Sequence, residues 1–310
     1  MNAVRAFAPG TVANLGPGLD ILALALDGAG DTVRVARAAG SVITIESSGH
    51  PDIPRDPARN TAGIAAAQVL ARAGAPTTGL AIEVVKGLPL SGGQGGSAAS
   101  AAAAAFAVNA LLGSPLAKKE LLSACLAAEE AVAGRHADNA AAALFGGVVL
   151  VLSLEPLDVV SLRFPEDLRV VLAEPEQRLR TEESRAALPR SVDRGIALAQ
   201  AAHVGALVAA LAQGDYELLC RAVEDGIAEP ARAPLLPGFS EAKAAALDAG
   251  AVGCSISGAG PSVFAFAVGE DRGRRIADAM LAAYRGRGIE ARARVCAIDT
   301  RGARVLEATE

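Results

Sequence analysis

The sequence predicts an α+β protein of two domains. Along its 310 residues, strand-like segments are interleaved with pairs of helices, and several strands are joined by turns short enough for hairpins. A doubly wound parallel sheet would instead repeat one strand and one helix. The chain becomes rich in proline and acidic residues across Glu155–Asp167, and a boundary there gives domains 1–160 and 161–310.

The first domain is expected to begin with strands and to continue with helices. Thr32–Ala36 and Ser41–Ser47 alternate apolar and polar residues, as paired antiparallel strands do. Gly74 suits the C-terminal end of the helix before it. The other expected elements are strand Val4–Ala8, loop Asn14–Asp20, strand Ile21–Leu26, helix Asn60–Gly74, strand Leu80–Val85, helices Ser97–Leu112 and Leu116–Ala133, and a helix end, Gly-Gly turn and strand within Ala143–Leu154.

The second domain is expected to repeat this mixture of elements. A second glycine-rich loop, Gly253–Ser262, overlaps the ends of two apolar segments that suit strands. The expected elements are strand Leu168–Ala173, helices within Arg190–Leu211, Tyr216–Ala228 and Glu241–Ala249, strands Ala251–Ile256 and Ser262–Val268, helix Arg272–Gly286 and strand Ala291–Ile298.

Composition and charge exclude several classes of protein. Hydrophobic residues make up 52% but aromatic residues only 3%, so the core must consist mainly of Ala, Val and Leu. The net charge of −5 comes from interspersed charges, without the clustered positive charge of a nucleic-acid surface. Four distant cysteines form no CxxC pair, which is typical of free thiols in a reducing compartment. The N-terminus lacks a signal-peptide core and the apolar runs are short for a membrane span, so we expect a soluble, cytoplasmic protein.

The stretch Lys86–Gly113 is the strongest local signal. Four of the five residues from Gly92 to Gly96 are glycine, and an alanine-rich helix follows. Ser97, or a residue just before it, is placed to cap that helix. Free N–H groups and the positive dipole end at a helix start bind anions. The loop matches neither the Walker-A nor the Rossmann pattern, and a flexible turn before a buried helix is the alternative.

Polar residues in other segments supply further groups suited to chemistry on an acidic small molecule. Glu129 lies two helical turns before His136, so both can face the same side if the helix persists. A hydroxyl at a phosphate loop, a helical carboxylate and paired arginines are groups that phosphoryl transfer would use. Turns, solvated charges and surface ion pairs are the alternative for each residue alone. The group consists of Asn14, Asp20, Glu129, His136, Asp138, Asn139, Arg185 and Arg232.

The chain resembles the superfamily of small-molecule kinases that includes galactokinase, homoserine kinase, mevalonate kinase and phosphomevalonate kinase, the GHMP kinases. Three blocks in order carry this resemblance, PGTVANLGPGLD (Pro9–Asp20), LPLSGGQGGSAASAAAA (Leu88–Ala104) and GCSISGAGPSVFAF (Gly253–Phe266). Three segments are similar to the homoserine kinase family in particular, GRHADNAAAALFGG (Gly134–Gly147), RTEESRAALP (Arg180–Pro189) and EPARAPLLPGF (Glu229–Phe239). The resemblance covers nearly the whole length. It implies an N-terminal ATP-binding α/β sandwich, a C-terminal ferredoxin-like α+β domain and an active site between them.

The resemblance also implies an ATP-dependent kinase that uses Mg²⁺ and phosphorylates L-homoserine in threonine biosynthesis. It implies catalytic roles for Asn139, Glu129 and Arg185, and metal binding by Ser97 and Glu129, because Mg²⁺ prefers oxygen ligands. The implied substrate-binding residues are Asn14, Asp20, His136, Asn139, Arg185 and Arg232, with Asp20 on the ammonium and the two arginines on the carboxylate. The implied ATP-binding residues are Asn60 near the adenine and Pro89, Leu90, Ser91, Gly92, Gly93, Gln94, Gly95, Gly96, Ser97, Ala98 and Ala99. Gly258 and Gly260 would line the site.

Two departures from the superfamily affect the expected mechanism. Relatives such as mevalonate kinase have an aspartate as candidate base near the place of Asn139. An amide takes no proton at neutral pH, so we expect direct attack of the substrate hydroxyl on the γ-phosphate. The phosphate loop has Gln94 and Gly96 where relatives usually have leucine and serine. This leaves Ser97 or a water molecule to complete the metal site.

Two other functions stay open at this point. One is another GHMP kinase, acting on shikimate or an isoprenoid alcohol such as mevalonate, and the paired arginines and Asn139 argue against it. The other is a non-catalytic nucleotide-binding regulator on the same scaffold, and the retention of Glu129 argues against that. The sequence leaves open whether the chain acts as a monomer or a homodimer, and it predicts no nucleic-acid or membrane partner.

Overall fold

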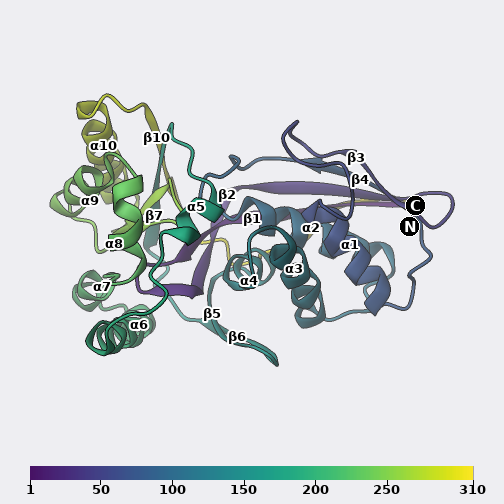
Figure 1. The fold of residues 1–310 in the computed structure, drawn as a ribbon, viewed down its shortest axis with the longest axis horizontal. Helices are drawn as coiled ribbons and strands as arrows, with labels where there is room; N and C mark the ends of the chain where they lie inside the picture. Colours follow the sequence, from purple (N-terminus) through teal and green to yellow (C-terminus); the bar gives the residue numbers. More distant parts are fainter. Residues whose placement is uncertain (310) are drawn as a thin grey trace.

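A computed structural model describes residues 1–309 and contains two sheets, each with its own helices (Figure 1). The first sheet has seven strands, in which the order β11-β1-β2-β4-β3 forms one path and β5 joins β2 to β6. Its strands are β1 (Ala3–Asn14), β2 (Gly18–Arg37), β3 (Ile43–Ser47), β4 (Leu80–Val85), β5 (Val148–Leu154), β6 (Leu157–Leu162) and β11 (Arg304–Thr309).

Four helices pack against the first sheet. They are α1 (Thr61–Arg72), α2 (Gly96–Leu111), α3 (Lys118–Val132) and α4 (Asp138–Phe145). The central helix, α2, is a run of alanines because alanine favours the helix and its small side chain lets neighbouring elements approach closely. Nearly all of its alanine side chains are fully buried among Val and Leu side chains of the sheet and of α1 and α3. The expected core of Ala, Val and Leu is therefore present.

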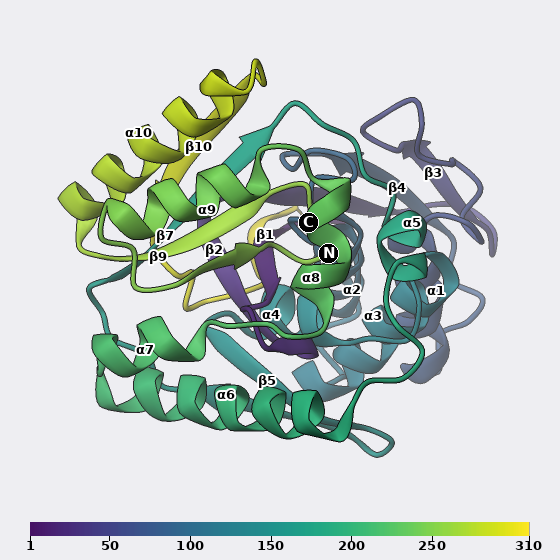
Figure 2. The same ribbon diagram turned by 60° about the vertical axis from the view of Figure 1, so that its left-hand side comes forward.

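The second sheet has four antiparallel strands, β7 (Leu168–Pro175), β8 (Cys254–Ile256), β9 (Val263–Val268) and β10 (Ala291–Cys296). Their order, β10-β7-β9-β8, is that of a ferredoxin-like sheet. Helices α9 (Phe239–Asp248) and α10 (Glu270–Gly286) cover one face, while α6 (Arg194–Gln213) and α7 (Tyr216–Ala222) lie on the other side (Figure 2). The predicted α+β fold with a ferredoxin-like second part is confirmed.

A shared hydrophobic core joins the two sheets. Leu207 and Leu211 of α6 pack in one buried cluster with Val12 of β1, Leu22 of β2 and Phe264 of β9. Two short helices complete this junction, α5 (Thr181–Ala186) and α8 (Ala228–Arg232), the latter followed by the 3-10 turn η1 (Ala233–Leu235). Because the junction is packed, residues from both halves are held in fixed positions relative to each other.

Helix α6 has an unusual surface. Of the described helices it alone is long and apolar enough to cross a membrane, with a mean hydropathy of 1.7, and only 22% of that window is buried. Its large exposed side chains include Ile196 and Leu198. Helices of globular proteins pass the same test of length and composition, so α6 carries no membrane assignment.

Two expectations about the strands were wrong, and a further helix was missed. The segments Thr32–Ala36 and Ser41–Ser47 do not pair, because β4 lies between them, antiparallel to β2 and parallel to β3. The strand expected at Ile21–Leu26 continues into Thr32–Ala36 as the single 20-residue strand β2. The sequence around Ala143 correctly indicated a helix end, a Gly-Gly turn and a strand, but the preceding α4 was not recognised as a separate helix.

The domain division at residue 160 stays a proposal. The Pro- and acid-rich stretch after Glu155 folds as β6, which pairs with β5 and so belongs to the first sheet. Strand β11 likewise pairs antiparallel with β1. We therefore propose domains 1–160 and 161–310 with the addition that the second segment returns to complete the first sheet.

Candidate active site

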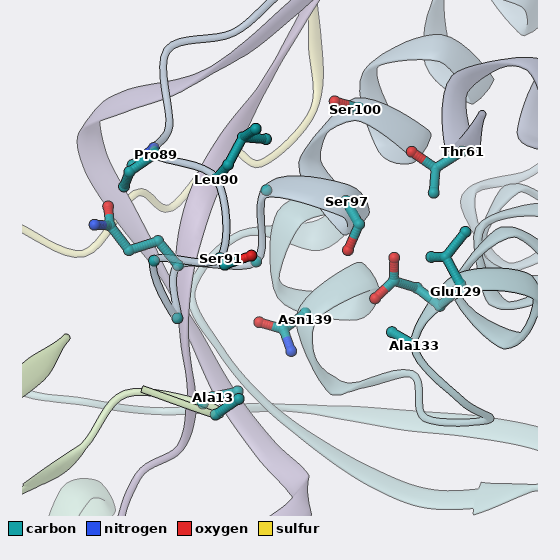
Figure 3. A pocket seen from close by; sticks show the side chains of 18 of the residues that line it. Ala13, Thr61, Pro89, Leu90, Ser91, Ser97, Ser100, Glu129, Ala133 and Asn139 are labelled. Atoms are coloured by element: carbon teal, nitrogen blue, oxygen red, sulfur yellow. The ribbon is translucent and has the colours of Figure 1, made fainter. Parts of the chain in front are cut away.

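A cavity of about 300 Å³ lies where the two halves meet. Its walls come from the loop between β1 and β2, the glycine-rich loop before α2, the starts of α1 and α4, the end of α3, and Arg185, Arg232 and Gly258 of the second half. Figure 3 shows the side of the cavity on which the glycine-rich loop faces Glu129 and Asn139. Its size and mixed lining suit a bound small molecule.

The glycine-rich loop ends in a helix start without a side-chain cap. Helix α2 begins at Gly96, and Gly95 is its N-cap with a left-handed backbone (φ 66°). Of the two alternatives expected for the cap, Ser97 or a residue just before it, the structure has the second, because Ser97 is the second helical residue and its hydroxyl faces Glu129 (Figure 3). The first N–H groups of an α-helix have no partner within the helix. This loop therefore offers main-chain donors to an anion.

Contacts from both halves hold the glycine-rich loop. The Thr11 N–H of β1 donates to the Gln94 carbonyl at 3.0 Å, and the Ser257 hydroxyl donates to the Gly93 carbonyl at 2.6 Å. Gln94 is buried, and Arg294 of β10 donates to its side-chain oxygen at 2.6 Å. The buried polar side chain of Gln94 therefore has a hydrogen-bond partner, Arg294, from the second sheet.

A buried ion pair beneath the loop was missed by sequence reasoning. Lys86 pairs with Asp31, which is fully buried, and Lys86 also donates to the Gly96 carbonyl at 2.8 Å. Ser100 donates to the same carboxylate at 2.6 Å. These contacts tie the first turn of α2 to β2. The sequence did contain one signal for this ion pair, because Lys86 directly follows the strand β4 and precedes the glycine-rich loop.

Glu129 is the buried carboxylate of the site. It is 2% exposed, and its Oε1 atom has no hydrogen-bond partner among the described residues. Burial raises the pKa of Glu129, while the charge of His136 and the Ser97 hydroxyl act in the opposite direction. Its neighbour Glu130 is exposed. The Oε1 oxygen of Glu129 is therefore available to accept a hydrogen bond or to bind a cation.

A second polar group lies at the other end of the cavity. Arg185 of α5 donates to both carboxylate oxygens of Asp20, at 3.2 and 2.9 Å. The Asn14 side-chain oxygen accepts from the Asp20 N–H at 3.2 Å, and its amide nitrogen donates to the Gly258 carbonyl. Both Asn14 and Asp20 have left-handed backbones (φ 74° and 62°), a conformation that Asn and Asp tolerate better than most residues. The β1–β2 loop is thereby shaped to present Asp20 to the second half.

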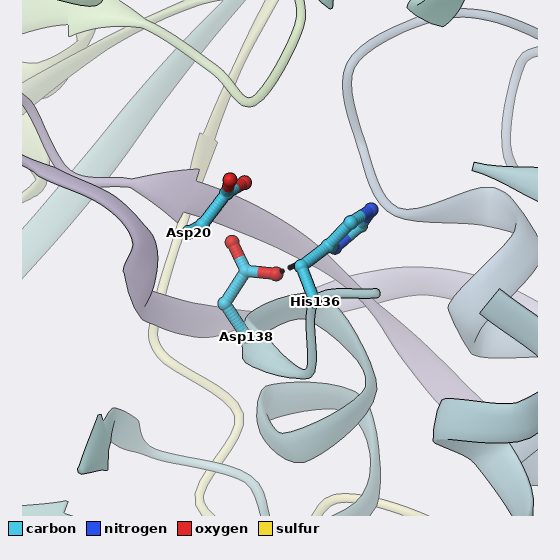
Figure 4. Close-up of side chains that lie close together, drawn as sticks. All are labelled: Asp20, His136 and Asp138. Atoms are coloured by element: carbon cyan, nitrogen blue, oxygen red, sulfur yellow. Dashed lines mark hydrogen bonds and ion pairs between the residues drawn. The ribbon is translucent and has the colours of Figure 1, made fainter. Parts of the chain in front are cut away.

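Asp20, His136 and Asp138 come close together in this group (Figure 4). Their ligand atoms lie within 4.8 Å of one another, and His136 and Asp138 share a hydrogen bond of 3.0 Å. Burial alone would lower the pKa of His136, but the bond and charge of Asp138 raise it above its usual value. Arg185 pairs with Asp20, so one carboxylate of this cluster already has a cationic partner.

Arg232 lies behind this group and is almost fully buried. It donates to the Gly258 carbonyl at 2.8 Å and to the Ser184 carbonyl at 3.4 Å. Burial lowers the pKa of Arg232, and the charge of Asp20 works against this. The guanidinium is held by main-chain oxygens only, so its positive charge has no direct carboxylate partner among the described residues. This suits the binding of an anionic group.

Asn139 is the second residue of α4 and lies beside the glycine-rich loop. Its side-chain oxygen accepts from the Thr11 hydroxyl at 2.6 Å, and its amide nitrogen lies 3.4 Å from Asp138 Oδ1. Asn60 is the N-cap of α1 and accepts from two helix N–H groups, while its nitrogen donates to the Pro54 carbonyl. Asn60 thus shapes the far end of the cavity with its polar atoms already paired.

Most of the residues expected in the site line this one cavity. The exceptions are Ala98, Ala99 and Gly260, of which the two alanines are fully buried inside the first turn of α2. Those that line it are Asn14, Asp20, Asn60, Pro89, Leu90, Ser91, Gly92, Gly93, Gln94, Gly95, Gly96, Ser97, Glu129, His136, Asn139, Arg185, Arg232 and Gly258.

A main-chain anion site facing a buried carboxylate, with arginines across the cavity, defines an ATP-dependent kinase of small molecules. Comparisons with known proteins agree with this class. The family models for the GHMP kinases N terminal domain and the GHMP kinases C terminal match residues 60–147 and 207–286. The chain belongs to the GHMP kinase family.

Curated relatives and solved structures place the chain beside the homoserine kinases of this family. It is 45% identical to a homoserine kinase of Arabidopsis thaliana, over 98% of this chain and 84% of that protein. A homoserine kinase of Chlorobaculum tepidum is 40% identical over the full length of both. The crystal structure of homoserine kinase from Cytophaga hutchinsonii superposes with a TM-score of 0.95 at 39% identity, covering 99% of this chain and 98% of that one.

Proposed function

We propose that this protein is a homoserine kinase, which transfers the γ-phosphoryl group of ATP to the side-chain hydroxyl of L-homoserine, giving O-phospho-L-homoserine for threonine biosynthesis. The observation that carries this proposal is the pairing of Asp20 with Arg185 and the partly unpaired Arg232 in one cavity. A carboxylate and two guanidinium groups complement the ammonium and carboxylate of an amino acid. The identity of 40–45% to proteins named homoserine kinase supports the same substrate.

The glycine-rich loop is the proposed ATP phosphate site. Main-chain N–H groups at the start of α2 would bind the phosphate oxygens, and Lys86, paired with Asp31, holds the first turn of that helix through the Gly96 carbonyl. Asn60 would stand at the adenine end of the cavity. Alanines 98 and 99 would contribute backbone atoms only, since their side chains are buried.

The proposed metal ligands are Ser97 and Glu129, and the residues present fit Mg²⁺. The unpartnered Oε1 of Glu129 and the facing Ser97 hydroxyl are hard oxygen donors, as Mg²⁺ prefers. A cation there would also offset the burial cost of the Glu129 carboxylate. When bound, Mg²⁺ neutralises charge on the transferred phosphoryl group.

In the proposed mechanism the chain positions its substrates and supplies no base. Asp20 would bind the ammonium group of homoserine, His136 would line the pocket beside it with its ring held by Asp138, and Arg185 and Arg232 would hold the carboxylate. The amide of Asn139 cannot accept a proton at neutral pH, so it would act as a hydrogen-bond donor beside the reacting oxygens. The hydroxyl oxygen would attack the γ-phosphorus directly as the bond to the β–γ bridging oxygen breaks and ADP leaves, because a loose transition state needs little base assistance. The hydroxyl proton would leave late, to a phosphate oxygen or to water.

A coupled ADP-release assay with homoserine, shikimate and mevalonate tests this proposal. We expect Mg²⁺-dependent turnover with homoserine and background rates with the other two alcohols. Turnover with mevalonate or shikimate alone would replace homoserine by another substrate of the family. ATP binding without turnover on any of the three would favour a non-catalytic regulator.

Two further points belong to the proposal. The four cysteines are free, in agreement with a cytoplasmic location. The second point is the oligomeric state, either a monomer or a homodimer. Sedimentation velocity at micromolar concentration would decide between them.

A further inference from the structure

Thr11 makes a side-chain contact that none of the roles above uses. It lies in the middle of β1, is fully buried and does not line the cavity. Its hydroxyl donates to Asn139 Oδ1 at 2.6 Å, and no other side-chain bond of Thr11 occurs among the described residues. The contact joins β1 to the start of α4, 128 residues further along the chain.

This bond lies directly under the glycine-rich loop. A Cβ atom placed on Gly95 would come within 2.1 Å of Thr11 Oγ1 and 2.7 Å of Asn139 Oδ1. The main chain of the loop therefore rests on the hydrogen-bonded pair with no room for a water molecule between them. The Thr11 N–H also donates to the Gln94 carbonyl, so one residue supports both the loop and Asn139.

The bond fixes which end of the Asn139 amide faces the cavity. With Oδ1 on the Thr11 hydroxyl, the amide nitrogen points toward Asp138, whose Oδ1 lies 3.4 Å away. The reverse orientation would bring the amide oxygen against the Asp138 carboxylate, where two acceptors repel each other. The Asp138 oxygen also bonds His136, which keeps that carboxylate in place.

We propose that Thr11 is a positioning residue for phosphoryl transfer, whose hydroxyl fixes the orientation of the Asn139 amide so that one N–H faces Asp138 and the second stays available to the reacting oxygens. This inference rests on the proposed kinase function and adds a residue outside the cavity to it. An amide with a fixed orientation donates without first reorganising, which lowers the barrier for the chemical step. An Asn139 side chain free to rotate would spend part of its time with an acceptor toward the phosphate oxygens.

The test compares Thr11→Val, which has the same shape without the hydroxyl, with Thr11→Ser, which keeps the hydroxyl. We expect Thr11→Val to lower kcat roughly ten- to a hundred-fold, as for the loss of one buried hydrogen bond that acts in the transition state. The KM for ATP should change little, because the N–H bond to Gln94 remains. Thr11→Ser should restore most of kcat. Thr44→Val, which removes a strand hydroxyl outside the cavity, is the matched control and should leave kcat unchanged.

A double-mutant cycle with Asn139→Leu separates positioning from stability. If Thr11 acts through Asn139, Thr11→Val should cost nothing further in kcat when Asn139 is already leucine. Thermal unfolding is measured on each variant, and Thr11→Ala replaces Thr11→Val if the latter does not fold. A lower melting temperature with unchanged kcat, or additive losses in the cycle, would overturn the inference.

The proposed function and this inference fail in different ways. Wild-type protein without homoserine turnover would refute the substrate, and the Thr11 comparison would then be made on the alcohol that the wild type phosphorylates. Wild-type turnover together with an equally active Thr11→Val would refute the positioning role alone.

Discussion

Arg185 and Asp20 connect the two halves of the protein through a two-pronged ion pair with distances of 2.9 and 3.2 Å. The two residues are 165 positions apart, and each side chain is about one-third exposed to the cavity. Such a pair presents both signs of charge to a zwitterionic ligand at one place. Its stability contribution is limited by solvent, so its main consequence concerns ligand binding.

Replacing Asp20 by asparagine should therefore impair substrate binding more than folding. The change removes the counter-charge for the ammonium group and one partner of Arg185. We expect KM for homoserine to rise about ten- to a hundred-fold, since hydrogen bonds to charged groups contribute about 1.5–3 kcal/mol. KM for ATP should stay within a few-fold. Glu155→Gln, which removes the exposed ion pair with Arg135, is the control and should change neither constant.

Glu129 and its neighbour provide a second pair of variants. Glu129→Gln should lower kcat by about a hundred-fold or more, because a metal ligand contributes several kcal/mol to the transition state. The variant should fold at least as stably as the wild type, since burial already disfavours the charged carboxylate. Glu130→Gln should leave kcat nearly unchanged because Glu130 is exposed. Titration of Mg²⁺ in the kinetic assay distinguishes lost metal affinity from misfolding, and equal small effects would contradict the assignment.

The two glycines at the start of α2 should respond very differently to a side chain. A Cβ atom at Gly96 would approach Lys86 Nζ to 3.3 Å and otherwise make only ordinary contacts at 3.8 Å, so Gly96→Ser should change KM for ATP a few-fold at most. Gly95 has a left-handed backbone and no space, so even Gly95→Ala should cost about 1–2 kcal/mol of stability from the backbone alone. The close approach of Gly95 to Thr11 and Asn139 adds a steric cost to this strain. Calorimetry with ATP and urea unfolding together measure both effects.

The pair of His136 and Asp138 predicts a pH dependence of stability. The pKa of His136 is raised above 6.5 in the folded protein, so the imidazolium stabilises the fold. This contribution is fully present below about pH 6.5 and is lost as the pH rises through the folded pKa. We expect the free energy of unfolding, from urea titrations between pH 6 and 9, to fall with pH more steeply in the wild type than in His136→Gln. Parallel curves for both proteins would show that His136 does not titrate in this way.

Much of the site could be predicted because its residues lie in local patterns. The glycine run, the turn from Asn14 to Asp20 and the helix with Glu129 each have a signature within about ten residues. The ion pair of Lys86 with Asp31 and the bond from Arg294 to Gln94 have none, since their partners are 55 and 200 positions apart. Such contacts depend on which strands become neighbours, and short apolar segments do not specify that order.

The strand order itself illustrates this limit. Thr32–Ala36 and Ser41–Ser47 have the alternation of a hairpin, and nothing local shows that β4 inserts between them. The insertion depends on α1, whose apolar side packs on α2 and α3 and carries the chain back to the sheet. Tertiary packing decides the pairing here, while local pattern decides only that both segments are strands.

Strand β11 gives the protein a particular order of assembly. Residues Ala3–Phe7 pair with Arg304–Thr309, so the edge of β1 away from β2 has no neighbour until the chain has been synthesised through residue 309. During translation the ATP-binding half would expose one edge of β1 while all of the second half emerges from the ribosome. An open strand edge readily pairs with other chains. Nascent chains of this protein should therefore depend on chaperones that protect such edges. A truncation before residue 304 removes only a few residues, but it should promote aggregation because it leaves this edge of β1 open.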